Sequence, residues 1–294
     1  MESLFKSGFR SFLESSYIDF IEYGNSFIFP DYEFAVELVQ AGCSATANSD
    51  DNLSCPGLEV PFSDVVYLYE DRWWSARNMV QERILARLER FRSVFARKCR
   101  VLTGRGNPQM ADLVKDFLHR HHTYSSAKCR YRYALEYEGE IVAVATFSEG
   151  RPMVRKIDSP LQNVPKEEQE NANILIFDSY EWIRYASLPG VRVVGGMGKL
   201  LNAFLEERYT RVEPGTPIEV MTYSDTEWSN GDVYEKLGFK FAGVREPVEY
   251  HVHKTNFTRL SQRLYEKELE QGALPDDFYT IRNMGSKKFL LQIL

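Results

Sequence analysis

Apolar positions between residues 70 and 98 recur at helical spacing. Their separations of four, four, three and four residues place them on one face of a helix. They are Val80, Ile84, Leu88, Phe91 and Phe95. The segment therefore predicts one long helix, and the apolar run at 64–69 before it predicts a short buried strand.

Residues 1–63 form an N-terminal extension. Its start mixes apolar and charged positions, as an amphipathic helix does, and lacks the continuous apolar stretch of a secretory signal. Residues 41–57 are small and polar with glycine and proline among them, which is typical of a loop.

Residues 106–255 alternate between strand and helix patterns. A helix is predicted to start near Pro108, followed by a hairpin of strands at 131–139 and 140–150 that turns at Glu138 and Gly139. A polar loop at 151–172 leads to further elements. These are a strand at 174–187, a glycine turn at 195–198 with a helix after it, a strand at 218–225, and a short helix closed at Gly238 before another strand.

Residues 256–294 predict a polar C-terminal helix ending at Gly272 and a hairpin turning at Met284 and Gly285. With the strand and basic helix at 64–105, the chain divides into four segments: 1–63, 64–105, 106–255 and 256–294. The alternation of elements indicates an α/β (α+β) protein.

The charge of the chain is uneven. The formal net charge is -6, which argues against a general attraction to nucleic acid. Between Arg72 and Arg105 the chain nevertheless carries ten basic residues against two acidic ones. One interpretation is a nucleic-acid surface centred on Arg83, Arg87 and Arg90. The favoured interpretation is a solvated face whose arginines pair with acidic neighbours.

Cysteine, histidine and apolar content narrow the class further. The four cysteines contain no C-x-x-C pair, so neither a zinc site nor a disulfide framework is expected, and reduced thiols in a cytoplasmic protein are preferred. His251 and His253 are spaced like two metal ligands, but no third ligand is evident, so no metal is expected. No apolar run approaches the length of about 20 residues that spans a bilayer.

Glycines before a helix suggest a phosphate site. Gly195, Gly196 and Gly198 precede the apolar stripe of a helix, where backbone N–H groups and the positive end of the helix favour a phosphate. Tight packing between a strand and a helix also selects glycine, so the pattern alone leaves both explanations open.

A second motif supports a phosphate-binding site at the glycine turn. Asn230 to Phe239, NGDVYEKLGF, resembles the signature of the last helix in GNAT acetyltransferases, and its distance from the glycine turn also fits. The resemblance implies a GNAT-like mixed, largely antiparallel sheet flanked by helices. It also implies acetyl-CoA as cosubstrate, with its pantetheine arm between strands 174–187 and 218–225. The residues that it assigns to the cofactor are Gly195, Gly196, Met197, Gly198, Lys199 and Asn230. Val193 stands where the family's phosphate turn usually has Arg or Gln.

The same resemblance implies transfer of an acetyl group to an unidentified amine. The amine attacks the thioester, so a base must take a proton and an acid must protonate the leaving thiolate. Tyr234 is the candidate acid and Glu181 the candidate base, with Asp178 as the next choice. Glu181 could instead be an ion-pair partner of Arg184 or Arg192. Trp182 and Met197 are the side chains expected to fill the space between the strands if no cofactor binds.

A wider resemblance covers residues 64–289. Segments such as VVYLYEDRWW, VVGGMGKLL and NMGSKKF look like the C-terminal region of phage homing-endonuclease-like proteins, which contains a GNAT-like module. It implies an alternative, a catalytically silent module associated with DNA through Arg83, Arg87 and Arg90. No Glu/Asp-x-Lys nuclease site is found.

Overall fold

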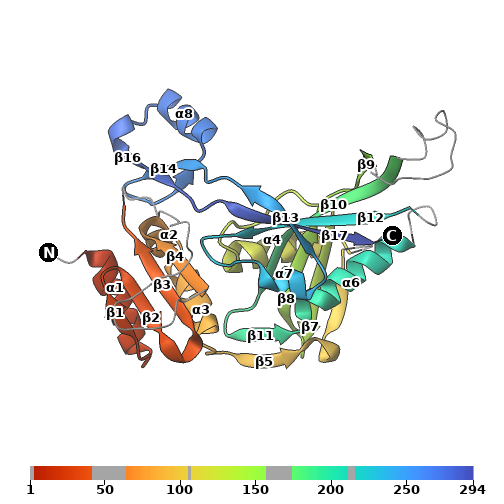
Figure 1. Ribbon diagram of the computed structural model, residues 1–294, viewed down its shortest axis with the longest axis horizontal. Helices are drawn as coiled ribbons and strands as arrows, with labels where there is room; N and C mark the ends of the chain where they lie inside the picture. Colours follow the sequence, from red (N-terminus) through yellow and green to blue (C-terminus); the bar gives the residue numbers. More distant parts are fainter. Residues whose placement is uncertain (1–2, 42–63, 105–106, 157–173, 211–215, 294) are drawn as a thin grey trace, which may run out of the picture. The chain divides into compact units, whose positions relative to one another are not determined.

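A computed structural model describes residues 3–41, 64–104, 107–156, 174–210 and 216–293 (Figure 1). The chain divides into two compact units, and each unit contains three stretches of chain. Unit 1 comprises Met1–Phe91, Tyr223–Val233 and Ala242–Lys288, and unit 2 comprises Arg92–Thr222, Tyr234–Phe241 and Phe289–Leu294. The predicted loop at 41–57 lies outside the described residues apart from Ala41. The loop predicted at 151–172 is wrong at its start, where Arg151–Lys156 form a strand, and the rest of it lies outside the described residues.

Unit 2 is built on a mixed, largely antiparallel sheet, which confirms the predicted fold class. The strand order is β13-β17-β12-β10-β8-β7-β6, and β9 also pairs with β10. Strand β10 runs parallel to β12 and antiparallel to β8 and β9, while β7 runs antiparallel to β6 and β8. The strands are β6 (Arg100–Thr103), β7 (Tyr131–Tyr137), β8 (Glu140–Phe147), β9 (Arg151–Lys156), β10 (Ile174–Ser187), β12 (Ile218–Asp225), β13 (Lys240–Arg245) and β17 (Ser286–Ile293).

The predicted hairpin is confirmed as β7 and β8. Glu138 and Gly139 both have positive φ, 52° and 83°, as the tight turn between two antiparallel strands requires. The alternation of side chains along β7 then fixes what each face of the sheet packs against.

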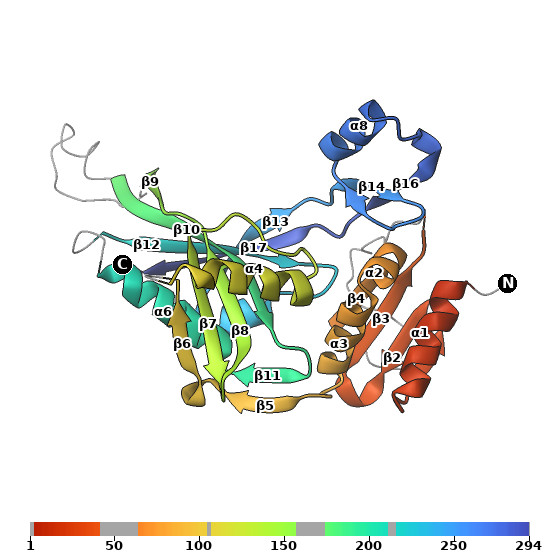
Figure 2. The ribbon, with the colours of Figure 1, turned by 180° about the vertical axis from the view of Figure 1, so that it is seen from behind.

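Two helices cover opposite faces of this sheet. Tyr133 and Leu135 on β7 pack in one cluster with Leu200 and Phe204 of α6 (Gly196–Tyr209). Ala134, which lies between them, packs in another cluster with α4 (Gln109–His121), whose N-cap is the predicted Pro108. Helix α6 lies in front of the sheet in Figure 1 and α4 in Figure 2. The α6 cluster is the larger core of unit 2.

The long helix predicted for 70–98 is wrong beyond Arg87. The segment forms α2 (Glu70–Ser75), α3 (Arg77–Arg87), β5 (Arg92–Phe95) and the 3-10 turn η2 (Ala96–Lys98). Val80, Ile84 and Leu88 are buried, as the helical spacing predicts. Glu89 has a left-handed φ of 56°, which stops the helix, and β5 then pairs in parallel with β11 (Val191–Val194).

Unit 1 contains a four-stranded sheet of order β1-β2-β3-β4. The predicted amphipathic N-terminal helix is confirmed as α1 (Leu4–Ser15), whose Phe5, Phe9 and Leu13 are buried in the same cluster as Trp73 of α2. The sheet consists of β1 (Ile21–Tyr23), β2 (Ser26–Phe29), β3 (Phe34–Val39) and the predicted strand β4 (Asp64–Tyr69), with the turn η1 (Pro30–Tyr32) between β2 and β3.

The C-terminal hairpin of the sequence analysis is wrong. Strand β16 pairs with β14 in a three-stranded sheet of order β15-β14-β16, whereas β17 joins the large sheet. The turn at Met284 and Gly285 therefore joins two sheets. The elements concerned are β14 (Glu249–His253), β15 (Arg259–Leu260), the predicted polar helix α8 (Gln262–Glu270), the turn η3 (Pro275–Asp277) and β16 (Phe278–Arg282).

Candidate acyl-CoA site

Strands β10 and β12 of unit 2 pair in parallel over four residues. Their register runs from Asp178 opposite Ile218 to Glu181 opposite Met221. Immediately afterwards, the pairing of β10 with β8 shifts register between Trp182 and Arg184. An irregularity of this kind bends a strand. The ladder between β10 and β12 ends at this point, and in the part of the chain that the structure describes the edge of β10 that faces β12 continues beyond it without strand pairing.

Helix α6 starts at a glycine turn. Gly195 is its N-cap with a left-handed φ of 76°, and within the described chain no side chain caps the first turn. The Lys199 N–H donates to the Gly195 carbonyl at 3.0 Å, so helical bonding begins there. The N–H groups of Gly196, Met197 and Gly198 precede that bond and are available to an anion at the positive end of the helix.

Packing and backbone conformation within the protein also explain two of these glycines. A Cβ atom at Gly196 would lie 2.9 Å from the Tyr185 hydroxyl and 3.0 Å from Val193 Cβ, while Gly195 needs its positive φ. Gly198 differs, because a Cβ there would meet only Leu237, at 3.4 Å among atoms within 4 Å. Tight packing therefore accounts for Gly196 and the left-handed backbone accounts for Gly195, whereas neither explains Gly198.

A groove of about 690 Å³ opens beside this turn. Val194, Gly195 and Gly198 line one part of it, and Phe95 and Arg97 line another. The Lys199 ammonium group does not extend freely as a phosphate ligand, because it donates to the carbonyl oxygens of Ala96 at 2.9 Å and Cys99 at 2.6 Å. Lys199 thus ties the η2 turn to the start of α6.

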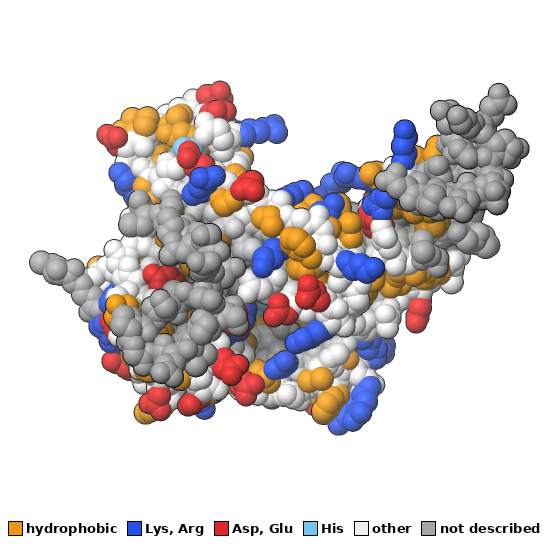
Figure 3. Space-filling model, in the orientation of Figure 1, with side chains coloured by type: hydrophobic (Ala, Val, Ile, Leu, Met, Phe, Trp, Pro, Cys, Tyr) orange, Lys and Arg blue, Asp and Glu red, His pale blue; other side chains and the backbone are white. Residues whose placement is uncertain are grey.

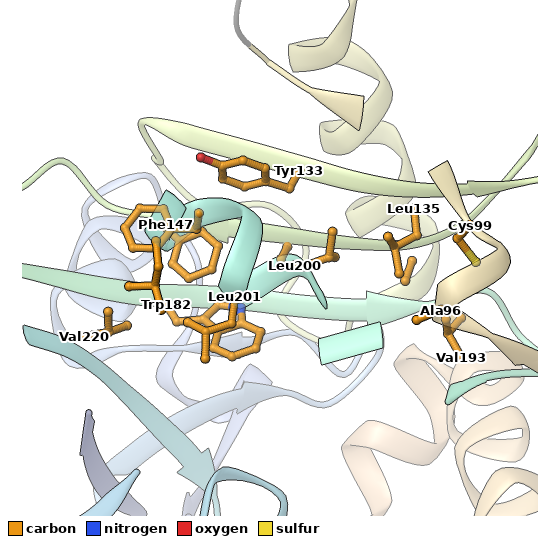
Figure 4. Packing of buried hydrophobic residues seen from close by; sticks show 14 of the residues in the cluster. Ala96, Cys99, Tyr133, Leu135, Phe147, Trp182, Val193, Leu200, Leu201 and Val220 are labelled. Carbon is orange, nitrogen blue, oxygen red and sulfur yellow. The ribbon is translucent and has the colours of Figure 1, made fainter. Parts of the chain in front are cut away.

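Trp182 occupies the point at which β10 and β12 part. Its side chain is 3% exposed, and its Nε1–H donates to the Arg184 carbonyl at 3.0 Å. The Thr222 hydroxyl of β12 donates to the Trp182 carbonyl at 3.2 Å. The indole also stacks on Phe147, with 5.3 Å between ring centroids, in the cluster of Figure 4. Met197, the other predicted filler, packs only partly buried against the same cluster.

Tyr234, the predicted acid, lies on α7 (Asp232–Lys236) and packs against this indole. Its ring centroid is 6.1 Å from that of Trp182 and 5.5 Å from that of Phe289. Burial raises the pKa of the Tyr234 hydroxyl, and a hydrogen bond with Thr222 acts in the opposite direction. The hydroxyl therefore keeps its proton at neutral pH, as a general acid must.

Glu181, the predicted base, is half-buried on β10. Its N–H donates to Ser148 Oγ at 2.8 Å and its carbonyl accepts from the Ser148 N–H at 2.9 Å. Strand pleating places its side chain on the face opposite Tyr180 and Trp182. Burial lowers the pKa of Arg184, and the charges of Tyr124 and Glu181 oppose this effect. The charge of Glu181 therefore favours the charged form of Arg184, but the salt bridges of the described residues do not include a pair between these two side chains.

Asn230 and the predicted nucleic-acid residues belong to unit 1. The Lys287 ammonium group donates to Asn230 Oδ1 at 3.2 Å. The Arg83 guanidinium lies 3.9 Å from the ring centroid of Trp228, which is buried in the unit 1 core. Arg87 forms an ion pair with Asp64 and donates to the Trp228 carbonyl, while Arg90 is exposed.

Other arginines of the basic segment also have acidic partners. In unit 2, Arg92 pairs with Glu140 at 3.1 Å and Arg100 with Glu136 at 2.7 Å. On the face seen in Figure 3, basic and acidic side chains are interspersed. These contacts agree with the interpretation of the segment as a paired, solvated surface.

Among the described residues, no group of three or more His, Cys, Asp or Glu side chains could hold a metal ion. His251 Nε2 lies 2.7 Å from Gln262 Oε1. None of the helices in the described ranges combines the length and the apolar character that a bilayer crossing requires.

No family model and no curated protein matches this chain. Among solved structures, a Bacillus subtilis acetyltransferase in complex with CoA shares 14% identity and covers 67% of this chain and 100% of its own, with a TM-score of 0.31. A GNAT family acetyltransferase from Elizabethkingia anophelis with acetyl-CoA bound shares 11% identity over 67% and 99%, with a TM-score of 0.33. Likenesses of this size are too weak to specify a ligand or a reaction.

Proposed function

We propose that unit 2 binds an acyl-CoA and transfers its acyl group to an amine. The observation that carries this proposal is the release of the β10 edge after Glu181, combined with an uncapped glycine turn that opens on the groove. In the proposed complex, the diphosphate lies at the N–H groups of Gly196 to Gly198. The pantetheine arm lies along the released edge of β10, as the resemblance to GNAT acetyltransferases implies.

The proposed reaction forms an amide and breaks a thioester. The neutral amine attacks the carbonyl carbon, the C–S bond breaks, and the amine proton passes to a base. Glu181 is the proposed base and Asp178 the next choice, and Tyr234 protonates the departing thiolate. Because Glu181 lies on the sheet face opposite Trp182, a substrate must reach between the parted strands to meet both groups.

Trp182 must move for this complex to form, because its indole lies where β10 and β12 part. Its N–H bond to the Arg184 carbonyl occupies a backbone acceptor of β10. In the proposed function, this bond breaks when the ligand enters, and the ligand takes over the strand edge.

Isothermal titration calorimetry with acetyl-CoA and CoA tests the proposal. We expect binding with a dissociation constant below 1 mM for the wild-type chain. An absence of heat at millimolar ligand would rule the cosubstrate out.

The second candidate is a catalytically silent module, and the buried indole of Trp182 is the observation that favours it. In this candidate function the module associates with DNA, as the resemblance to phage homing-endonuclease-like proteins implies. It predicts a salt-sensitive gel shift that is lost when Arg83, Arg87 and Arg90 are replaced by alanine. A gel shift that the triple variant leaves unchanged would reject these residues as the DNA contact.

A further inference from the structure

An exposed aromatic ring and an arginine border the groove beside the glycine turn. Phe95 is 44% exposed although it is a large apolar residue, and the Arg97 guanidinium lies 4.8 Å from the centroid of its ring. Both side chains line the groove together with Gly195 and Gly198. The helical spacing of the sequence predicts Phe95 on the buried face of a helix, so its position at the groove could not be predicted from that spacing.

Two sets of contacts hold this pair next to the start of α6. The parallel ladder of β5 and β11 ends with Phe95 opposite Val194, the residue before Gly195. The Lys199 ammonium group then binds the carbonyl oxygens of Ala96 and Cys99, which flank Arg97 in the chain. The η2 turn is thus fixed to the helix from which the phosphate-binding amides would project.

The chemistry of the pair suits a nucleotide. A phenylalanine ring and a guanidinium plane both offer surfaces on which a base can stack. Arginine also forms strong charge-assisted hydrogen bonds with phosphate. Arg97 and Lys199 add two positive charges to the groove, against one negative charge from Glu206.

We infer that Phe95 and Arg97 recognise the nucleotide end of the ligand and thereby make the site selective for CoA over carriers without the nucleotide. Phe95 supplies the surface for the adenine base, and Arg97 binds a phosphate of the nucleotide. The inference rests on the proposed function, because the same ligand must place its diphosphate at the α6 amides.

The test compares two ligands and matched variants by isothermal titration calorimetry. CoA carries the nucleotide, and 4′-phosphopantetheine has the same arm without it. We expect the wild-type chain to bind CoA more tightly. Arg97→Ala should weaken CoA binding about tenfold or more and leave phosphopantetheine binding unchanged, since one charged hydrogen bond of this kind is lost.

Two further variants sharpen the comparison. Lys98→Ala removes an equal charge from the next residue, which is exposed and does not line the groove, so CoA affinity should stay at the wild-type value. Phe95→Leu keeps an apolar side chain but lacks the ring. It should weaken the binding of CoA and leave the binding of 4′-phosphopantetheine unchanged. Thermal melting of each variant checks that the fold is kept.

Several outcomes would overturn the inference while leaving the proposed function in place. One is wild-type affinity that is equal for the two ligands. Another is an Arg97→Ala variant that loses affinity for both ligands equally, because the role would then concern the shared arm or the fold. Failure of the wild-type chain to bind CoA at all would instead reject the proposed function.

Discussion

The indole of Trp182 is buried at the point where β10 and β12 part, and it fills the proposed acyl-CoA site there. Its indole is held by a local bond to Arg184, only two residues away, and by stacking on Phe147. Moving it costs this hydrogen bond and part of the burial of a large ring. A ligand that needs the strand edge must supply that free energy from its own binding.

Shortening Trp182 should therefore change stability and affinity in opposite directions. We expect Trp182→Leu to lower the free energy of unfolding by about 2–4 kcal/mol, because it leaves a cavity in the core. The same variant should bind CoA several-fold more tightly, since less must be displaced. Urea unfolding and calorimetric titration measure the two effects.

Phe147→Leu is the matched control for Trp182→Leu. Phe147 lies in the same stack and is fully buried, yet its ring is not bonded to the β10 edge. It should lose stability without gaining affinity. If both variants tighten CoA binding equally, general loosening of the core is the cause. The hypothesis that CoA must displace the Trp182 indole would then be rejected.

Tyr234 is the second residue whose role can be isolated. Because burial raises its pKa above the ordinary value of 10, its ionisation should not limit activity at neutral pH. Tyr234→Phe should slow release of the CoA thiol from acetyl-CoA, in the presence of small primary amines, by about a hundredfold. The KM for acetyl-CoA should change little.

Tyr209→Phe provides the comparison for Tyr234→Phe, because Tyr209 is an exposed tyrosine at the end of α6 and should show wild-type turnover. A Tyr234→Phe variant with unchanged kcat would remove the acid role. A variant that changed only KM would assign Tyr234 to binding instead.

Helix α6 is the element on which the proposed phosphate site depends. Gly198 lies in its first turn and lines the groove, with space for a small side chain. An aspartate there suits the positive helix end and should keep the fold stable, but its charge would repel a diphosphate.

Gly198→Asp should therefore weaken CoA binding at least tenfold without lowering the melting temperature. Gly198→Asn is nearly the same size and uncharged, so it should weaken binding much less. Calorimetric titration at two salt concentrations checks the electrostatic cause, because added salt should narrow the difference between the variants. Equal affinities of the two variants would place the diphosphate elsewhere.

Elements with local signals could be predicted from the sequence, and elements with distant partners could not. The β7–β8 hairpin and the start of α4 each follow from neighbouring residues such as Gly139 and Pro108. Strand β5 was mistaken for helix because Leu88 and Phe95 keep helical spacing, while its partner β11 lies far along the chain. The groove residues Phe95 and Arg97 depend on that pairing and were missed for the same reason.

The path of the whole chain explains why sequence-based segments do not describe the units. Strands β12, β13 and β17 each run from one unit into the other, so neither unit is a continuous stretch. Periodicity identifies an element but not the sheet that it joins, and β17 was consequently assigned to a hairpin with β16. In unit 1, the distant stretches are joined by a buried ionic cluster.

The cluster consists of Arg259 between two carboxylates, and all three side chains are at most 4% exposed. Arg259 Nε lies 2.5 Å from Asp71 Oδ2, and Arg259 Nη1 lies 2.7 Å from Glu227 Oε1. Among the described residues, Glu227 Oε2 has no hydrogen-bond partner. Burial raises the pKa of Glu227 from 4.5 to about 7, against the opposing charge of Arg259.

This raised pKa predicts how the stability of the chain varies with pH. The folded state binds a proton at Glu227 up to about pH 7, whereas the unfolded state releases it near pH 4.5. Stability from this group is therefore full below pH 4.5, falls as the pH rises towards 7, and changes no further above that. The total loss is about 3 kcal/mol.

Glu227→Gln removes the proton exchange and keeps an oxygen for Arg259. The difference in unfolding free energy between the variant and the wild-type chain, measured by urea denaturation from pH 4 to 8, should therefore grow in favour of the variant as the pH rises. Taking the difference cancels the titration of other carboxylates and of His121. If the difference stays constant, the Glu227 carboxylate is ionised throughout this range, and its ion pair with Arg259 outweighs the cost of burial.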